Sequence, residues 1–159
     1  MTYILDTNIF RKLLDHFPRK GKLFTVVWEN IETGIITGEY ISVDECYNEM
    51  TRHYSEKSEN YEWLKNHKKM FLSPTNEESL ILKDLFLNKK MQESIHSKNI
   101  LQNRPSADPY LVAKAKSLNA VIVTEEKFKP NSAQLPNLCE ALGVKWITYD
   151  DFMDIVTSK

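Results

Sequence analysis

Short apolar runs alternate with amphipathic stretches along this chain, and the alternation predicts strands and helices in turn. The run Tyr3-Ile4-Leu5 ends at Asp6 and is too short for a helix, so it predicts a buried strand. Apolar residues at positions 9, 10, 13 and 14 form a stripe of helical period, which predicts a helix over 7–15. A similar stripe predicts a helix over 23–31, and Tyr40-Ile41 predicts a second strand.

Start signals for helices mark the middle of the chain. Ser42 followed by Glu45 fits a capping box, which predicts a helix from there to about residue 54. Another helix is predicted over 61–68, and Thr75 with Glu78 forms a second capping box before a helix that continues to residue 87. Residues 88–105 are polar and basic with weak periodicity, and they predict a frayed helix or a mobile loop.

The last third of the chain repeats the helix and strand signals more clearly. Asp108 before Pro109 predicts an N-cap and the first position of a helix, and Asn119 predicts its left-handed end. The unbroken apolar run over 120–123 predicts a strand that is covered on both faces of its sheet.

Further signals complete the pattern. Asn137 and Gly143 bracket a short predicted helix, residues 144–147 predict a last strand, and Thr148 with Asp151 predicts the cap of a final helix. Strands that alternate with helices predict an α/β fold, here a three-layer α/β/α sandwich around a mainly parallel sheet of four to five strands. The length of 159 residues predicts a single domain over 1–159, with a variable helical or loop insertion around 55–105.

Composition narrows the function classes. The formal net charge is −1, which excludes a strongly basic nucleic-acid binder, so any nucleic-acid site must be a local feature. Cys46 and Cys139 form no C-x-x-C pair, which argues against a thiolate zinc site and predicts two buried thiols in a reducing compartment. The sequence has neither a signal-peptide pattern nor an apolar run of about 18 residues, so we expect a cytoplasmic protein without a membrane span.

Acidic residues gather where ligands of open parallel sheets bind, beyond the carboxyl ends of the strands. Asp6 ends the first strand, Glu49 lies in the helix after the second, and Asp108 opens the helix before the strongest strand. Glu125 and Glu126 follow that strand directly. Several separate segments therefore each deliver a carboxylate to one predicted edge of the sheet.

Each acid also has an ordinary structural explanation when it is taken alone. Asp6 and Asp108 are suitable helix caps, and Glu49 is placed to pair with Arg52 or His53 on a helix surface. The joint pattern favours chemistry, because carboxylates within about 4–6 Å repel one another and raise each other's pKa unless a cation lies among them. Oxygen ligands suit Mg²⁺ or Mn²⁺, which can lower the pKa of a water and orient a phosphodiester.

These same residues carry a family resemblance. The string Tyr3-Ile4-Leu5-Asp6-Thr7-Asn8 resembles the opening of PIN-domain nucleases, which include the VapC-type toxin ribonucleases. The second acid of that family lies in a pattern similar to Asn48-Glu49-Met50, and the third lies in a segment like residues 107–115. Their next strand resembles residues 121–124, with an acid or amide two residues after the threonine, and that register selects Glu126 over Glu125. The resemblance spans residue 3 to about residue 152, and residues 136–144 resemble an uncharacterised prokaryotic PIN-like subgroup.

The resemblance implies a metal-dependent endoribonuclease that leaves a 5′-phosphate and a 3′-hydroxyl. It implies that Asp6, Glu49, Asp108 and Glu126 hold Mg²⁺ or Mn²⁺ and carry the catalysis. RNA would be the substrate, and a cognate antitoxin protein and a second copy of the chain are the partners that the resemblance admits.

Four further residues are candidates for supporting roles. Asn8 and Thr124 would orient the carboxylates or water. Arg11, about one helical turn beyond Asp6, and Arg104, shortly before Asp108, are candidates for phosphate contacts.

Other classes of α/β protein fit this sequence less well. A phosphatase of the haloacid dehalogenase type needs a second Asp two residues after the first, where this chain has Asn8. A receiver domain would need a phosphoacceptor Asp that ends a middle strand, and nucleotide-binding loops would need a glycine-rich turn that this sequence lacks. The alternative is a PIN-like binding module, partnered by an antitoxin or RNA, with weak or no catalysis. Binding alone does not require all four acids, so their presence favours the enzyme.

Overall fold

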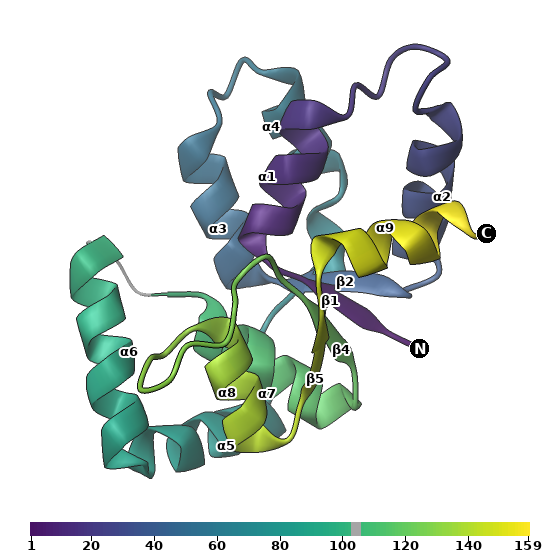
Figure 1. Ribbon diagram of the computed structural model, residues 1–159. Coiled ribbons are helices and arrows are strands. Elements are labelled where there is room, and N and C mark those ends of the chain that lie inside the picture. The colour runs from purple at the N-terminus through teal and green to yellow at the C-terminus, as the bar shows by residue number, and fades with distance from the viewer. Residues whose placement is uncertain (103–105) are drawn as a thin grey trace.

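A parallel sheet forms the centre of the molecule. The computed structural model describes residues 1–102 and 106–159, and in that part five parallel strands follow the order β3-β2-β1-β4-β5 (Figure 1). The strands are β1 (Tyr3–Leu5), β2 (Tyr40–Val43), β3 (Phe71–Leu72), β4 (Val121–Val123) and β5 (Lys145–Ile147). The predicted α/β fold with a parallel sheet is confirmed.

Helices cover both faces of the sheet and complete three layers (Figure 1). One face carries α1 (Thr7–His16), α2 (Thr25–Ile36), α3 (Asp44–His53), α4 (Glu59–Asn66) and α9 (Tyr149–Thr157). The other side carries α5 (Asn76–Leu87), α6 (Lys89–Gln102), α7 (Asp108–Leu118) and α8 (Leu135–Leu142), and a short 3₁₀ turn, η1 (Lys68–Met70), leads into β3. This division follows from right-handed crossovers, because the chain builds the sheet in one direction up to β3 and in the other direction afterwards.

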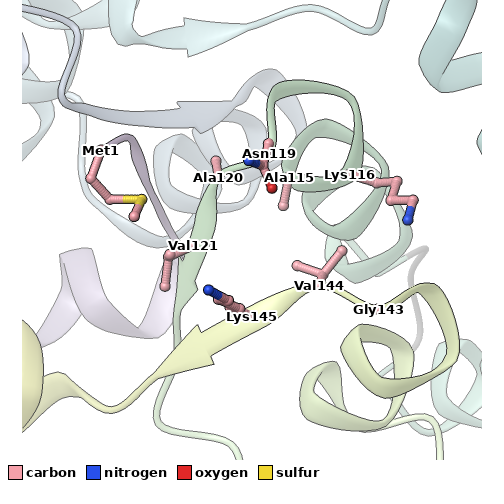
Figure 2. Close-up of a pocket in the computed structure, with 9 residues that line it drawn as sticks. All are labelled: Met1, Ala115, Lys116, Asn119, Ala120, Val121, Gly143, Val144 and Lys145. Atoms are coloured by element: carbon pink, nitrogen blue, oxygen red, sulfur yellow. The ribbon is translucent and has the colours of Figure 1, made fainter.

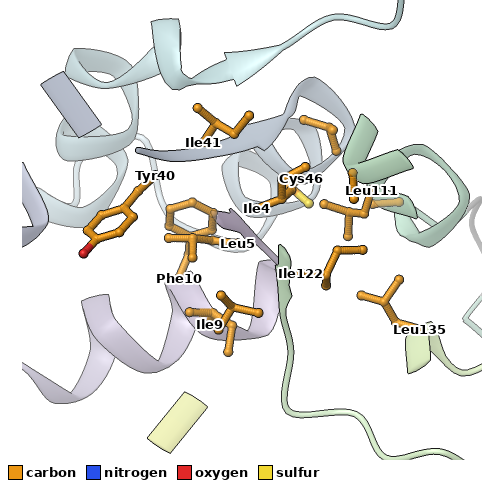
Figure 3. Close-up of a cluster of buried hydrophobic side chains, with 14 of the residues drawn as sticks. Ile4, Leu5, Ile9, Phe10, Tyr40, Ile41, Cys46, Leu111, Ile122 and Leu135 are labelled. Carbon is orange, nitrogen blue, oxygen red and sulfur yellow. The ribbon is translucent and has the colours of Figure 1, made fainter. Parts of the chain in front are cut away.

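The hydrophobic core lies on both faces of the central strands. Ile4 and Leu5 of β1 and Ile122 of β4 are fully buried, as strands covered on both sides require (Figure 3). Phe10 of α1 and Leu111 of α7 pack in the same cluster. The core therefore fixes β1 and β4 side by side, and their register pairs Leu5 with Val123 at the carboxyl edge.

Several local predictions are confirmed. The capping box at Thr75 is present, with Glu78 bonded back to the cap residue, and Thr148 caps α9 in the same way. Asn119 ends α7 and Gly143 ends α8, both in the left-handed region, at φ 50° and 66°. Both cysteines are buried thiols.

The predicted cap at Ser42 is wrong. Ser42 belongs to β2, where it pairs with Phe71 of β3, and its hydroxyl donates to the carbonyl of Leu5 at 2.7 Å. The N-cap of α3 is Val43, which makes no side-chain capping bond. Strand pairing with β3, a two-residue strand that the sequence did not predict, extends β2 through the position where the helix was expected to begin.

Residues 89–102 form the helix α6, so the helical alternative for this segment is the one that the structure shows. The predicted cap at Asn137 is wrong. Asn137 lies inside α8, whose N-cap is Gln134, and its side chain bonds to Lys129. Among the residues that the structure describes, no helix is long and apolar enough to cross a membrane.

Candidate active site

Asp6 stands at the carboxyl edge of the central strand β1. It precedes α1 in the N-cap position, but its side chain makes no capping bond, and its Oδ2 accepts a hydrogen bond from Thr124 Oγ1 at 3.0 Å. The pairing of β1 with β4 brings Thr124 to this place, one residue beyond the Leu5–Val123 pair. Asp6 is only 4% exposed, so its carboxylate is buried beside the next strand and does not serve as a surface helix cap.

Glu49 reaches the same edge from the second turn of α3. Its Oε2 accepts a hydrogen bond from Thr7 Oγ1 at 2.7 Å, and its Oε1 accepts one from the backbone N–H of Ala107 at 3.3 Å. Its side chain is buried, unlike that of a residue paired with a neighbour on the helix surface. Glu49 thus ties together the starts of α1 and α7.

Asp108 is the first residue of α7, and the predicted N-cap role is wrong because Ala107 holds that position. The Asp108 side chain is buried, and its backbone N–H donates to Ser106 Oγ at 3.2 Å. Since α7 leads back to the start of β4, its first turn lies at the carboxyl edge with Asp6.

The two glutamates after β4 point to different neighbours. The N–H of Glu126 donates to Thr124 Oγ1 at 3.1 Å, and Glu126 Oε2 accepts from the N–H of Leu135 at 2.7 Å. The charge of Glu126 acts on Asp6. Glu125 is exposed and pairs with Lys12 at 3.1 Å. Glu126 therefore lies near enough for its charge to raise the pKa of Asp6, whereas Glu125 pairs with Lys12 at the surface.

The four acids that the sequence singled out form one electrostatic cluster. Burial raises the pKa of Asp6 most, and the charges of Asp108, Glu126 and Glu49 raise it further against the opposing bond from Thr124, to about 8. A buried carboxyl group among three others therefore retains its proton near neutral pH unless a positive charge compensates the cluster.

A divalent cation fits this cluster in charge and in ligand chemistry. Carboxylate oxygens are the ligands that Mg²⁺ and Mn²⁺ prefer, and the pKa of Asp6 is raised first by burial and then by the negative charges of its neighbours, both of which a bound cation would offset. Within residues 1–102 and 106–159, no three His, Cys, Asp or Glu side chains already stand as a metal cage. Thr7, Thr124 and the N–H groups of Ala107 and Leu135 hold several of the carboxylate oxygens. Cation binding would thus require the carboxylates to turn towards a common centre.

The two residues predicted to orient the carboxylates, Thr124 and Asn8, differ in their surroundings. Thr124 bonds to Asp6, at the position predicted for an orienting residue. Asn8 is exposed on the first turn of α1, and its neighbour Thr7 is buried and bonds to Glu49. Sequence reasoning missed Thr7, because a threonine in the first turn of a helix carries no signal of a partner 42 positions away.

Of the two candidate arginines, Arg11 lies on α1. Arg11 is half-buried on α1, and its Nε is buried without a hydrogen-bond partner in the described part of the chain. Burial raises the pKa of Tyr54, and the nearby charge of Arg11 partly offsets that effect. Arg104 lies outside the described residues.

A separate cavity lies at the opposite end of the strands (Figure 2). Its volume is about 140 Å³, and it is lined by the start of β4, the end of α7 and the α8–β5 connection, with Met1, Lys116 and Lys145 among its residues. None of the described residues that line it is acidic, and none belongs to the carboxylate cluster.

Comparisons with known proteins support the fold. A family model described as "Domain of unknown function (DUF4411)" matches residues 3–158. A search of curated proteins finds no match to the sequence. A chain in the solved structure of VapBC-1 from nontypeable Haemophilus influenzae is similar, with a TM-score of 0.54 and 16% identity over 94% of this chain and 99% of that chain. At this identity the likeness shows a shared fold.

Proposed function

We propose that this chain, which belongs to the DUF4411 family over residues 3–158, is a metal-dependent endoribonuclease. The observation that carries the proposal is the cluster around Asp6, whose pKa is raised to about 8 by burial and by Asp108, Glu126 and Glu49. A protein that only binds a partner has no evident need for four mutually repelling acids at one edge of its sheet.

Two kinds of likeness support the assignment. The motifs around Asp6, Glu49 and Asp108 resemble those of PIN-domain nucleases, and the fold is similar to that of a VapBC-1 chain. VapC-type proteins are toxin ribonucleases within the PIN group, so we further propose that this chain is the toxin of a toxin–antitoxin pair. Its substrate would then be cellular RNA in the cytoplasm, and its partner a cognate antitoxin. We treat 1–159 as one PIN-like domain whose variable insertion spans about 55–105.

The residues have distinct tasks in this mechanism. Asp6, Glu49, Asp108 and Glu126 would hold Mg²⁺ or Mn²⁺, which supplies Lewis acidity towards the phosphodiester and lowers the pKa of an attacking water. Thr124 donates to Asp6 and Thr7 donates to Glu49, so each hydroxyl would guide the orientation of its carboxylate when a cation binds. The cluster needs no nucleophilic side chain, because water can attack the phosphorus in line with the leaving oxygen.

Cleavage of RNA in the presence of Mg²⁺ or Mn²⁺ tests the proposal. We expect the wild-type chain to cut RNA and to leave 5′-phosphate ends, and we expect Asp6→Asn and Asp108→Asn each to abolish cutting without loss of the fold. The matched control is Asp84→Asn, which changes an exposed aspartate on α5. A wild-type chain that stays inactive on varied RNAs with both metals would instead favour the binding module.

A further inference from the structure

The loop that follows the fourth acid carries an exposed aromatic side chain. Residues 124–134 join β4 to α8, and Figure 1 shows this loop running from the end of β4 towards α6 before it turns into α8. Phe128 lies two residues beyond Glu126, and it is 52% exposed. It stands between Lys127 and Lys129, which are also exposed. A single exposed phenylalanine is ordinary by itself, so its surroundings decide its meaning.

The loop is fixed on both sides of Phe128. Before it, Glu126 Oε2 accepts the N–H of Leu135 at 2.7 Å. After it, Asn137 bonds to both backbone groups of Lys129, since its Oδ1 accepts the N–H at 3.1 Å and its Nδ2 donates to the carbonyl at 2.6 Å. Asn137 is buried, and its two bonds to the exposed residue Lys129 are partly buried. These bonds therefore anchor the loop on both sides of Phe128, two residues after Glu126.

A surface cavity opens beside the ring. Its volume is about 470 Å³, within the range of roughly 300–1,000 Å³ that small-ligand sites occupy. Phe128, Met91 and Pro130 give it apolar walls, and Ser132 and Glu140 place polar groups on its lining. An aromatic ring with other apolar side chains and a few polar groups in the lining suits a planar heterocycle with hydrogen-bonding atoms on its rim.

We propose that Phe128 and this cavity form a subsite for one unpaired base of single-stranded RNA. The inference rests on the proposed function, because the loop begins at Glu126 in the carboxylate cluster. Single-stranded RNA is recognised by stacking of splayed bases on aromatic rings, with cationic side chains along the backbone. Lys127 and Lys129 supply those cations on either side of the ring. A protein surface would gain less from this arrangement, since an apolar ring between two lysines complements a base flanked by phosphates.

Binding measured apart from cleavage tests the subsite. The affinity of a short, unstructured, fluorescein-labelled RNA is measured by anisotropy in the Asp6→Asn background, which the proposed function makes inactive. Stacking of a base on an aromatic side chain contributes about 1–3 kcal/mol, so Phe128→Ala should raise the Kd roughly 5- to 150-fold. Phe128→Tyr keeps an aromatic face and should bind almost as tightly as the parent.

Two controls separate the subsite from a general effect. Phe86→Ala removes a phenylalanine of comparable exposure, 40%, on α5 and should leave the Kd unchanged. A duplex of the same sequence should show no dependence on Phe128, because its bases are already stacked on one another. Equal affinities of the Phe128→Ala and parent chains, or the same loss with duplex RNA, would overturn the inference.

The kinetics of the active chain provide an independent readout. Phe128→Ala should raise KM for single-stranded RNA and leave kcat within about twofold, as expected when a uniform binding contact is lost. An active enzyme whose KM is unchanged by Phe128→Ala would refute the subsite and leave the nuclease assignment intact. An inactive wild-type chain whose RNA affinity depends on Phe128 would refute the nuclease and leave the subsite.

Discussion

Replacing Asp6 by Asn should stabilise the protein when no metal is present. The side chain is buried, and burial together with Asp108, Glu126 and Glu49 raises its pKa from 3.8 to about 8. Asn has nearly the same shape, keeps an oxygen that can accept the bond from Thr124 Oγ1, and carries no charge. The substitution therefore removes the electrostatic cost and preserves the packing.

The magnitude follows from the pKa shift. In the unfolded chain an aspartate ionises near pH 4, whereas folded Asp6 retains its proton up to about pH 8. Because the folded pKa is the higher one, the favourable contribution is complete below pH 4 and is lost as pH rises towards 8. At about 1.4 kcal/mol per pH unit, the ceiling at pH 7 is about 4 kcal/mol. We expect Asp6→Asn to recover about 2–4 kcal/mol of unfolding free energy at that pH.

Urea unfolding in EDTA at pH 5, 7 and 8.5 measures this gain. The advantage of Asp6→Asn over wild type should be small at pH 5 and should grow up to about pH 8. Asp84→Asn serves as the control, because it neutralises an exposed aspartate and should change stability by no more than about 0.5 kcal/mol.

Added metal should narrow the difference in stability between Asp6→Asn and wild type. A ligand at 100 times its Kd stabilises the folded state by about 2.7 kcal/mol, and the wild-type cluster should gain this while Asp6→Asn gains less. A variant no more stable than wild type in EDTA at pH 8.5, or a difference that does not change with pH, would refute the account of Asp6 as a buried acid among repelling neighbours.

Two other substitutions test buried polar contacts, one at the site and one between α5 and α7. Thr7→Val removes the hydroxyl that donates to Glu49 and keeps the shape of the side chain. It should lower kcat for RNA cleavage, and it should lower the free energy of unfolding, measured in urea, by about 1–3 kcal/mol. An unchanged kcat would show that Thr7 does not position Glu49. Lys114→Ala leaves Glu78 buried without its ion-pair partner at 2.7 Å, so the free energy of unfolding should fall by about 3–5 kcal/mol. The double variant Lys114→Met with Glu78→Leu removes both charges and should recover most of that loss of stability. A double variant as unstable as Lys114→Ala would contradict this explanation.

The sequence predicted the fold because its strongest signals are those that a buried parallel sheet imposes. The runs at Tyr3–Leu5 and Val121–Val123 are unbroken and apolar since both faces of these strands are covered. Once the strands were placed, Asp6 and Asp108 followed, because the carboxyl ends of parallel strands share one edge. The register of the resemblance also selected Glu126, and the structure brings its charge next to Asp6.

The features that were missed depend on contacts between distant parts of the chain. Ser42 has the local pattern of a helix cap, but the pairing of β2 with β3 and the carbonyl of Leu5 decide its role. Thr7 and Asn8 are equally polar neighbours, and only the position of α3 shows which of them meets Glu49. No local pattern in the sequence contains that information.

Glu126 connects the carboxylate cluster to the loop beyond it. The same side chain that lowers the tendency of Asp6 to ionise also accepts the N–H of Leu135, at the start of α8. If a cation draws this carboxylate towards Asp6 and Asp108, the bond to Leu135 must lengthen or be shared, and one of the two attachments that hold the Phe128 loop weakens. The other attachment, between Asn137 and Lys129, does not involve the cluster and would keep the loop in place. Metal binding would therefore affect the position of the Phe128 loop through Glu126 only when the attachment at Asn137 is lost, so Asn137→Leu should make RNA affinity more sensitive to metal than it is in the wild-type chain.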